Sequence, residues 1–290
     1  MLLELKNIRK IFSVQKGFLG RARSFVSAID GVSLAMAQGE NLSLVGESGC
    51  GKTTLARIIL KLIVPDSGSI HFNGEDITLL SKRRFRAYRK YIQIVFQDPY
   101  SSLDPRFTVR NIIKEAMILD KNKYKTEQEK EFRILEILKA VQLEGDILSR
   151  FPHEFSGGER QRIAIARALV MNPKLVILDE AVSSLDVLIQ EQLIHLLLDL
   201  QKKYELTFLF ISHNLKVVKK ISHRIAVMYK GKIVELASSD EIFKNPLHLY
   251  TKELLAAAVD YKAFKRIHEI EINREAHLVD YGQGHFVIGE

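Results

Sequence analysis

The sequence predicts an α/β fold with a parallel sheet, an N-terminal antiparallel β portion and an inserted helical portion. Three observations support this prediction: a phosphate-binding loop between a strand and a helix, alternating strands and helices after residue 160, and a helix-patterned stretch before it. Strands that alternate with helices are typical of a parallel sheet with helical crossovers. We therefore expect a core of about residues 1–97 and 160–240, a helical insertion at about 98–159, and a C-terminal extension at 241–290.

The most informative segment, residues 46–54, fits the phosphate-loop pattern G-x-x-x-x-G-K-[ST]. Apolar residues 41–45 precede it as a buried strand, and residues 54–60 follow it with a helical pattern. Glycines let the backbone turn its N–H groups toward phosphate, and the helix N-terminus adds its positive dipole end. An ordinary glycine-rich turn is the alternative for the loop alone. The candidate nucleotide-binding residues are Gly46, Glu47, Ser48, Gly49, Cys50, Gly51, Lys52, Thr53 and Thr54.

Two side chains of this loop have specific expected roles. We expect Lys52 to reach the β- and γ-phosphates of ATP as a catalytic cation, and Thr53 to bind Mg²⁺. Cys50 lies between two glycines of the loop, so its alkylation is expected to block nucleotide binding.

Composition excludes several classes of protein. The 290 residues are 47% hydrophobic, yet no stretch approaches the roughly 18–20 uncharged apolar residues of a membrane helix. Charges within the first six residues argue against a signal peptide. We expect the chain on the cytoplasmic face of the cell membrane, as a peripheral protein. The single cysteine, Cys50, excludes an internal disulfide and a cysteine-based metal site.

The net charge of +8 leaves the partner open. The densest basic run, residues 82–90, has two interpretations: a patch for nucleic acid or lipid, or the solvated face of a short helix. We favour the second interpretation. Nothing else in the chain clusters Lys and Arg with aromatic side chains in a stacking arrangement.

Periodicity and turn signals predict the remaining elements. A capping box at Thr126–Glu129 begins a helix in the insertion. Strands are expected at residues 2–8, 69–72 (with a turn at Asn73 and Gly74), 91–96, 175–178 and 207–211, and on both sides of Gly231; helices are expected at 160–170 and 188–204, with a short helix after 211 and a mainly helical tail.

Two carboxylates end the apolar strand 175–178. In a nucleotide site a buried strand delivers an aspartate to Mg²⁺ beside the phosphate loop, so Asp179 fits the metal role, through water. Glu180 fits the general base that orients the attacking water, a role that contributes typically 10²–10⁴-fold. A strand that merely ends in solvated acids is the alternative, and the phosphate loop upstream makes it the weaker one.

Three further features specify the type of site. Ser156, Gly157 and Gly158 precede a helix and form a second anion-binding surface. Gln97 ends a strand, as a residue sensing the γ-phosphate does, and it joins Thr53 and Asp179 as a candidate Mg²⁺ ligand. His213 follows an apolar strand; such a histidine is often structural, but its order after the carboxylates favours a γ-phosphate role.

In this order, these motifs resemble the ATP-binding subunit of an ABC transporter over nearly the whole chain. The resemblance implies an ABC ATPase domain at 1–240 and ATP with Mg²⁺ as cofactors. It also implies that two subunits enclose two ATP molecules, with each phosphate loop facing Ser156 and Gly158 of the other subunit. Residues 183–186, including Asp186, would then couple the two sites, while Gln97 and the helical insertion would contact the membrane subunits.

Finer features resemble the peptide/nickel importer group. They are residues 95–105, 179–186 and 245–255, an N-terminal hairpin loop at 16–27 and, more loosely, residues 284–287. This implies uptake of oligo- or dipeptides, with a second ATPase subunit (identical or different), two transmembrane permeases, an extracytoplasmic solute-binding protein and no nucleic acid. The alternatives are a nickel or metal-chelate importer, an exporter ATPase, and a soluble ABC-type ATPase acting on nucleic acid.

Some positions depart from the family pattern or stay ambiguous. Glu159 stands where Gln is usual, Phe155 where Leu is frequent, and Ala181 where Pro is common, and none of these removes a phosphate ligand. Phe12 is the candidate for stacking on adenine, with a core aromatic at a strand end as the equal alternative. Two isolated histidines near the end of the chain, His277 and His285, are a weak candidate for a metal site.

Overall fold

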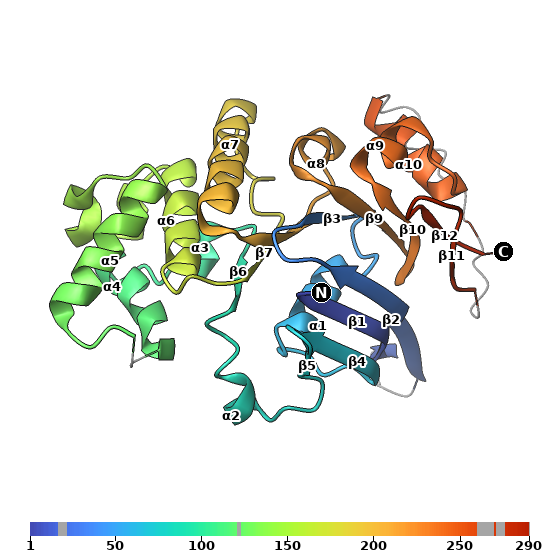
Figure 1. Cartoon of the computed structure of the whole chain (residues 1–290), viewed down its shortest axis with the longest axis horizontal. Helices are drawn as coiled ribbons and strands as arrows, with labels where there is room; N and C mark the ends of the chain where they lie inside the picture. The colour runs from blue at the N-terminus through green and yellow to red at the C-terminus, as the bar shows by residue number, and fades with distance from the viewer. Residues whose placement is uncertain (17–21, 121–122, 260–269, 271–275, 290) are drawn as a thin grey trace. The chain divides into compact units, whose positions relative to one another are not determined.

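The computed structural model describes residues 1–16, 22–120, 123–259, 270 and 276–289 (Figure 1). The chain divides into two compact units. The first unit contains residues 1–37, 41–79 and 211–290, and the second contains residues 38–40 and 80–210. The predicted division at residues 97, 160 and 240 stays a prediction.

An antiparallel sheet of order β2-β1-β4-β5 forms the N-terminal part of the first unit. β1 (Leu3–Lys16) pairs with β2 (Ala22–Met36), from Leu3 opposite Met36 to Lys16 opposite Ala22. β1 is longer than the strand predicted at 2–8, because register shifts after Leu5 interrupt the alternation that a sequence pattern detects. Within the loop expected at 16–27, residues 22–27 are strand, and residues 17–21 lie outside the described part of the chain.

The predicted turn at Asn73 and Gly74 is confirmed. It joins β4 (Ser67–Phe72) to β5 (Glu75–Asp76), and its two residues have φ values of 51° and 83°. Two successive left-handed residues are the signature of a type I′ hairpin turn, which Asn-Gly favours.

The second sheet of this unit has the strand order β11-β12-β10-β9-β3. β3 (Asn41–Val45) is buried throughout and runs parallel to β9 (Arg224–Tyr229), with Leu42 opposite Arg224. β9 and β10 (Lys232–Ser238) form the antiparallel hairpin expected around Gly231. α1 (Lys52–Ile59) follows β3 through the phosphate loop, and α8 (Leu215–Ile221) precedes β9.

The tail is only partly helical, so the prediction of a mainly helical tail was incomplete. α9 (Ser239–Lys244) and α10 (Leu249–Val259) match it, but β11 (Leu278–Asp280) and β12 (Phe286–Ile288) do not. β12 pairs with β10, with Glu235 opposite Val287, and β11 pairs with β12. Strands of three residues are too short to show a hydrophobic period.

A buried carboxylate attaches this tail to the sheet. Glu235 of β10 is 0% exposed, and its carboxylate accepts hydrogen bonds from the backbone N–H groups of Leu247 (2.8 Å) and His248 (3.1 Å). The same carboxylate lies 2.7 Å from Nε2 of His285, which precedes β12. One side chain therefore joins β10 to both the helical and the strand part of the tail.

The second unit contains the strands in the order β8-β7-β6. β6 (Ile92–Val95) is parallel to β7 (Leu175–Asp179), with Ile92 opposite Leu175. β7, β8 (Thr207–Ile211) and α7 (Val187–Tyr204) occur where the sequence predicts them, and both strands are buried at every position.

Between β6 and β7 the described residues form helices and no strand. They are α3 (Pro99–Ser102), α4 (Val109–Ala116), η1 (Met117–Asp120), α5 (Glu127–Ala140), η2 (Gly145–Ser149), η3 (Pro152–Glu154) and α6 (Gly157–Leu169). α4, α5 and α6 pack against one another (Figure 1). The basic run 82–90 begins with the short helix α2 (Lys82–Phe85); its cationic side chains are exposed or half-buried, which agrees with a solvated face.

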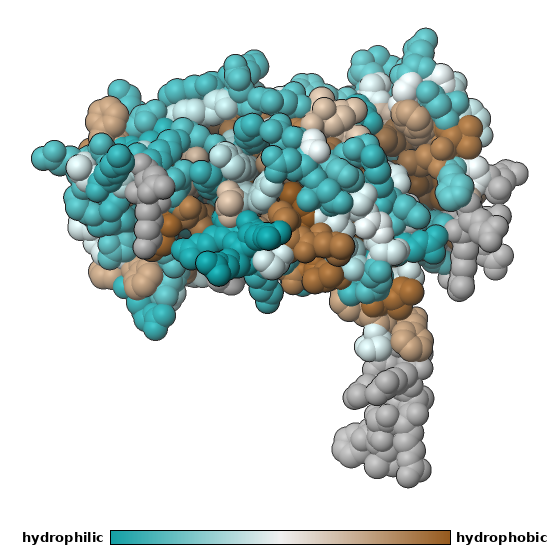
Figure 2. Space-filling model, turned by 60° about the horizontal axis from the view of Figure 1, so that its bottom comes forward, coloured by the Kyte–Doolittle hydropathy of each residue, from teal (hydrophilic) through white to brown (hydrophobic). Residues whose placement is uncertain are grey.

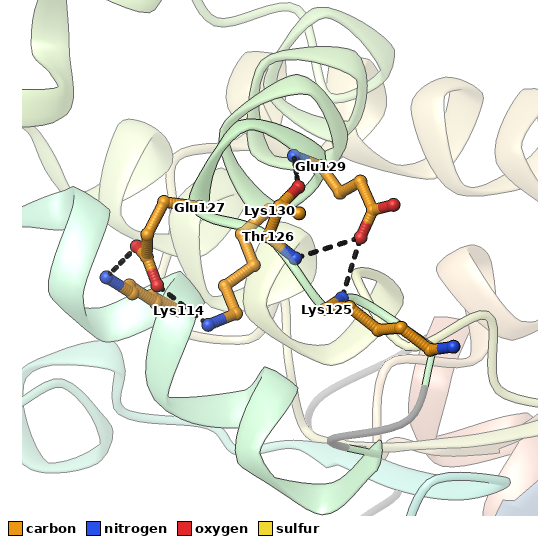
Figure 3. A network of polar contacts seen from close by, with 6 residues as sticks. All are labelled: Lys114, Lys125, Thr126, Glu127, Glu129 and Lys130. Carbon is orange, nitrogen blue, oxygen red and sulfur yellow. Dashed lines mark hydrogen bonds and ion pairs between the residues drawn. The ribbon is translucent and has the colours of Figure 1, made fainter.

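The predicted capping box begins α5 (Figure 3). The hydroxyl of Thr126 accepts a hydrogen bond from the N–H of Glu129 (3.1 Å), and the Glu129 carboxylate accepts from the N–H groups of Thr126 (3.0 Å) and Lys125 (2.6 Å). In the first turn, Glu127 also pairs with Lys114 and Lys130. These contacts satisfy backbone donors that have no partner inside the helix.

We expect Glu235→Gln to lower the free energy of unfolding by about 1–3 kcal/mol, because an amide offers one acceptor oxygen where the carboxylate serves three donors. Urea unfolding measures this effect, and Asp240→Asn is the matched control, since its ion pair with Lys244 is exposed. Equal unfolding midpoints for the two variants would contradict the role of Glu235.

Candidate functional site

The phosphate loop packs so closely on its neighbours that two of its positions require glycine. A Cβ atom on Gly46 (φ 147°) would lie 2.1 Å from the carbonyl oxygen of Met228, and one on Gly51 (φ 117°) would lie 2.4 Å from that of Ala28. Both residues also adopt backbone conformations that side chains disfavour. The loop is therefore fitted to the end of β9 and to β2.

The opposite side of the loop is open. Ser48 and Gly49 are exposed, and a Cβ on Gly49 would meet no atom within 4 Å. Gly51 is the N-cap of α1, and no side chain caps this helix N-terminus. An uncapped helix N-terminus beside an open glycine-rich turn suits a phosphate group, so these residues fit the nucleotide expected from the sequence.

Lys52 lies inside the loop and is 5% exposed. Its ammonium donates hydrogen bonds to the carbonyl oxygens of Gly46 (2.7 Å) and Glu47 (2.8 Å) and lies 3.7 Å from Sγ of Cys50. These contacts hold one positive charge within the loop, where Coulomb attraction to phosphate is strong because water is largely excluded.

Cys50 is packed rather than presented to solvent. Its side chain is 8% exposed, and its carbonyl oxygen accepts a hydrogen bond from the N–H of Gly231 (3.0 Å). Burial raises the pKa of the Cys50 thiol, and the nearby Lys52 offsets only part of this rise. The thiol is therefore a poor nucleophile at neutral pH.

One contact to the loop comes from the tail, and no motif predicts it. The hydroxyl of Tyr250 accepts a hydrogen bond from the N–H of Glu47 at 3.0 Å. The sequence signal available for it was only the resemblance of residues 245–255 to the importer group.

In the second unit, the two predicted carboxylates stand at the end of β7. Asp179 is the last residue of the strand and is 6% exposed, while Glu180 is half-buried with φ 51°. The carbonyl oxygen of Glu180 accepts hydrogen bonds from the N–H (3.1 Å) and the hydroxyl (2.8 Å) of Ser183. A left-handed residue at this point ends the strand sharply and begins the turn that contains residues 183–186.

The structure brings Gln97 next to that turn. The hydroxyl of Ser184 donates a hydrogen bond to the carbonyl oxygen of Gln97 (3.4 Å), and Gln97 itself is exposed just after β6. Asp186 is exposed at the N-cap position of α7. Gln97, Glu180 and the 183–186 turn therefore form one local group in the second unit.

Ser156 and its two glycines lie at the start of α6, as expected. The hydroxyl of Ser156 accepts from the N–H of Glu159 (3.3 Å) and donates to its carboxylate (2.7 Å), which also accepts from the N–H of Ser156 (2.8 Å). These hydrogen bonds from Ser156 lower the pKa of Glu159. The acidic residue at 159 is therefore a helix cap, which explains a position where the sequence departs from the family pattern.

The glycines of this segment also have a packing role. A Cβ on Gly158 would lie 2.8 Å from the side chain of Ile189 in α7, and one on Gly157 would lie 3.3 Å from Leu185. Ser156 and Gly157 are exposed, so the start of α6 is accessible to a ligand.

His213 and Phe12 belong to the first unit. His213 is exposed, and the N–H of the preceding Ser212 donates to the carbonyl oxygen of Leu44 (3.4 Å), so this turn lies beside the end of β3. Phe12 on β1 is 37% exposed and is not a core aromatic. Phe12 lies opposite Val26 of β2, and both are exposed; Ile11 and Phe25 are also exposed, and strand alternation places them on the other face of the hairpin. Figure 2 shows in brown and tan where apolar residues reach the surface on one side of the molecule.

The two late histidines are not brought together as a metal site. His285 is 7% exposed and pairs with Glu235, and His277 is exposed. In the described part of the chain, no group of three or more His, Cys, Asp or Glu side chains could hold a metal ion. Among the same residues, no helix is long and apolar enough to cross a membrane.

The chain belongs to the ABC transporter family, whose model matches residues 29–183. It is an ATPase of the kind coupled to transport. Its relatives include the oligopeptide transport ATP-binding proteins AppF and OppF of Bacillus subtilis. AppF is 50% identical over 257 residues, which cover 88% of this chain and 78% of AppF. OppF is 43% identical over 299 residues, which cover 99% of this chain and 95% of OppF.

A third relative, the glutathione import ATP-binding protein GsiA of Pectobacterium atrosepticum, is 48% identical over 88% of this chain, which spans 41% of GsiA. Solved structures agree on the fold. A dimeric ATP-binding cassette in a post-hydrolysis state with ADP and Pi has a TM-score of 0.71 and 28% identity, covering 82% of this chain and 98% of that one. The cbiO1 protein of Clostridium perfringens, part of the transporter complex cbiONQ, has a TM-score of 0.72 and 26% identity, covering 92% and 95%. The predicted fold class and family are confirmed.

We expect iodoacetamide to modify Cys50 slowly at neutral pH and faster as the pH rises, because only the thiolate reacts and burial raises the pKa of the thiol. The adduct would lie against Gly46 and block nucleotide binding, and ATP added first should protect the thiol. Mass spectrometry reports this site alone, since Cys50 is the single cysteine. Full ATPase activity after complete modification would contradict the prediction.

Proposed function

We propose that this chain is the ATP-hydrolysing subunit of a heteromeric importer for oligo- or dipeptides. The observation that supports ATP hydrolysis is the phosphate loop. It packs against its neighbours at Gly46 and Gly51, is exposed at Ser48 and Gly49, and contains the buried Lys52. In this proposal residues 46–54 bind the phosphates of ATP through their backbone N–H groups and Lys52.

Three oxygen-bearing side chains are proposed to hold Mg²⁺: Thr53 of the phosphate loop, Gln97 just after β6, and Asp179 at the end of β7, the last through water. Hydroxyl, carboxylate and amide oxygens are the donors that Mg²⁺ prefers, so the residues fit this ion. When bound, Mg²⁺ neutralises charge on the β- and γ-phosphate oxygens.

Glu180 is the proposed general base. Glu180 is half-buried and directly follows the buried Asp179. Its left-handed backbone (φ 51°) ends β7, so the chain turns between the two acids. Gln97 and His213 are proposed to sense or contact the γ-phosphate. Catalysis then consists of positioning and charge neutralisation, with Glu180 directing the water.

A second subunit would complete the site. The exposed start of α6, with Ser156, Gly157 and Gly158, suits nucleotide held by another copy or a sister ATPase, and Asp186 would couple the two sites. The similarity to a dimeric cassette supports this proposal. The capping hydroxyl of Ser156 would exchange its bond to Glu159 for one to phosphate.

Peptides are the proposed cargo, because relatives of 43–50% identity that match most of their own length are named for oligopeptide transport. The alternatives predicted from the sequence, nickel and nucleic acid, are not favoured by these relatives. We propose peripheral attachment to the cytoplasmic face of the membrane, through two permeases served by an extracytoplasmic solute-binding protein.

We expect Glu180→Gln to keep ATP binding while lowering ATP hydrolysis by about 10²–10⁴-fold, the usual contribution of a general base. Lys52→Ala should instead lose ATP binding. Glu205→Gln is the matched control, because Glu205 is also a left-handed glutamate (φ 52°) in the second unit but ends α7, outside the site. Hydrolysis by Glu180→Gln equal to that of Glu205→Gln would refute the assigned base.

We expect gentle extraction of membranes from the source organism to recover the tagged chain with two permeases and a second ATPase subunit. Mass spectrometry of the purified complex identifies these partners, and the Lys52→Ala chain, which should still assemble, serves as a control. Recovery of soluble partners alone, or of nucleic acid released with a steep salt dependence, would sink the transport proposal.

A further inference from the structure

The C-terminal extension contacts the phosphate loop through one buried side chain. Tyr250 of α10 is 0% exposed, and its hydroxyl accepts a hydrogen bond from the N–H of Glu47 at 3.0 Å. Its ring packs on that of Tyr229 in β9, with 4.3 Å between the ring centroids. A buried hydroxyl without a partner would be costly, so this hydrogen bond defines where the ring and the loop lie relative to each other.

The N–H group that Tyr250 contacts belongs to a peptide unit that Lys52 contacts as well. The carbonyl oxygen of Gly46 and the N–H of Glu47 are the two polar groups of one peptide bond. Lys52 donates to this carbonyl at 2.7 Å, and Tyr250 accepts from this N–H at 3.0 Å. Since a peptide unit is planar, its N–H and C=O point in opposite directions, and the tyrosine therefore sets the direction in which the carbonyl meets the ammonium.

Hydrogen bonds also connect the start of α10, which contains Tyr250, to β10. Glu235 binds the N–H groups of Leu247 and His248, and Nδ1 of His248 accepts a hydrogen bond from the N–H of Tyr250 at 3.1 Å. His285 pairs with the same carboxylate. A continuous set of contacts thus runs from β10 through the start of α10 to the first peptide of the phosphate loop.

We infer that Tyr250 is a positioning residue for ATP binding and hydrolysis, which fixes the peptide between Gly46 and Glu47 and through it the place of Lys52. This inference rests on the proposed role of residues 46–54 as the nucleotide-binding loop. Through Tyr250, α10 is then part of the ATP site, and displacement of α10 from Glu235 loosens the loop. Burial raises the pKa of Tyr250 far above its usual range, so the hydroxyl stays neutral across physiological pH.

The test compares Tyr250→Phe with Tyr229→Phe in the full chain. Both substitutions remove one hydroxyl from the same buried ring pair, but the hydroxyl of Tyr229 accepts from the N–H of Ile270 (3.2 Å) and not from the loop. Three quantities are measured: amide hydrogen exchange of the peptide containing Glu47 without nucleotide, the Kd for MgATP, and the KM and kcat of ATP hydrolysis.

For Tyr250→Phe we expect faster exchange at Glu47 and a Kd and KM for MgATP raised about threefold to tenfold, the effect of one lost hydrogen bond. The kcat should change less than KM, because the loop binds the phosphates in both the ground and the transition state. Tyr229→Phe should leave all three quantities near those of the parent chain, and unfolding midpoints show whether either variant loses general stability.

Unchanged exchange at Glu47 and unchanged MgATP affinity in Tyr250→Phe would overturn the inference. Equal weakening by both substitutions would overturn it as well, because the effect would then come from packing of the ring pair. Failure of the parent chain to bind MgATP would instead refute the proposed function, and the exchange measurement, which needs no nucleotide, would still decide whether Tyr250 orders the loop.

Discussion

The close approach of the phosphate loop to the backbone of β9 and β2 is the constraint on which the rest of the first unit depends. Glycine at 46 and 51 allows contacts that a Cβ would prevent, at 2.1 Å from Met228 and 2.4 Å from Ala28. The carbonyl oxygen of Cys50 then meets the N–H of Gly231 in the β9–β10 turn. The loop is therefore held by three different segments before any phosphate arrives, which reduces the ordering that nucleotide binding requires.

The described parts of the tail pack against the same sheet and the same loop. Its strands extend the sheet from β10, and its helix α10 reaches the loop through Tyr250. Glu235 holds β10 to the tail. A fully buried carboxylate is tolerated only when hydrogen bonds replace its lost hydration. Three donors from two separated parts of the tail meet that need.

In the second unit, the helices pack on one another and also leave a proposed anion-binding surface exposed at the start of α6. Gly158 allows α6 to approach α7, and Ser156 with Glu159 caps the exposed start of α6. The glutamate at 159, which departs from the family pattern, strengthens this cap because its carboxylate accepts two hydrogen bonds from Ser156. Its negative charge also interacts favourably with the positive end of the helix dipole.

Local patterns in the sequence determined much of this protein. The phosphate loop, the Asn73-Gly74 turn, the capping box before α5 and the strands β3, β7 and β8 depend on residues close together in the chain, so motif, turn chemistry and periodicity reveal them. Only the tertiary structure decided the burial of Cys50, the pairing of Glu235 with His285, the strands β11 and β12, and the contact of Tyr250 with Glu47. The His285 and Tyr250 contacts join positions 50 and 203 residues apart, and the energy of burial and hydrogen bonding that forms them leaves no periodic trace in the sequence.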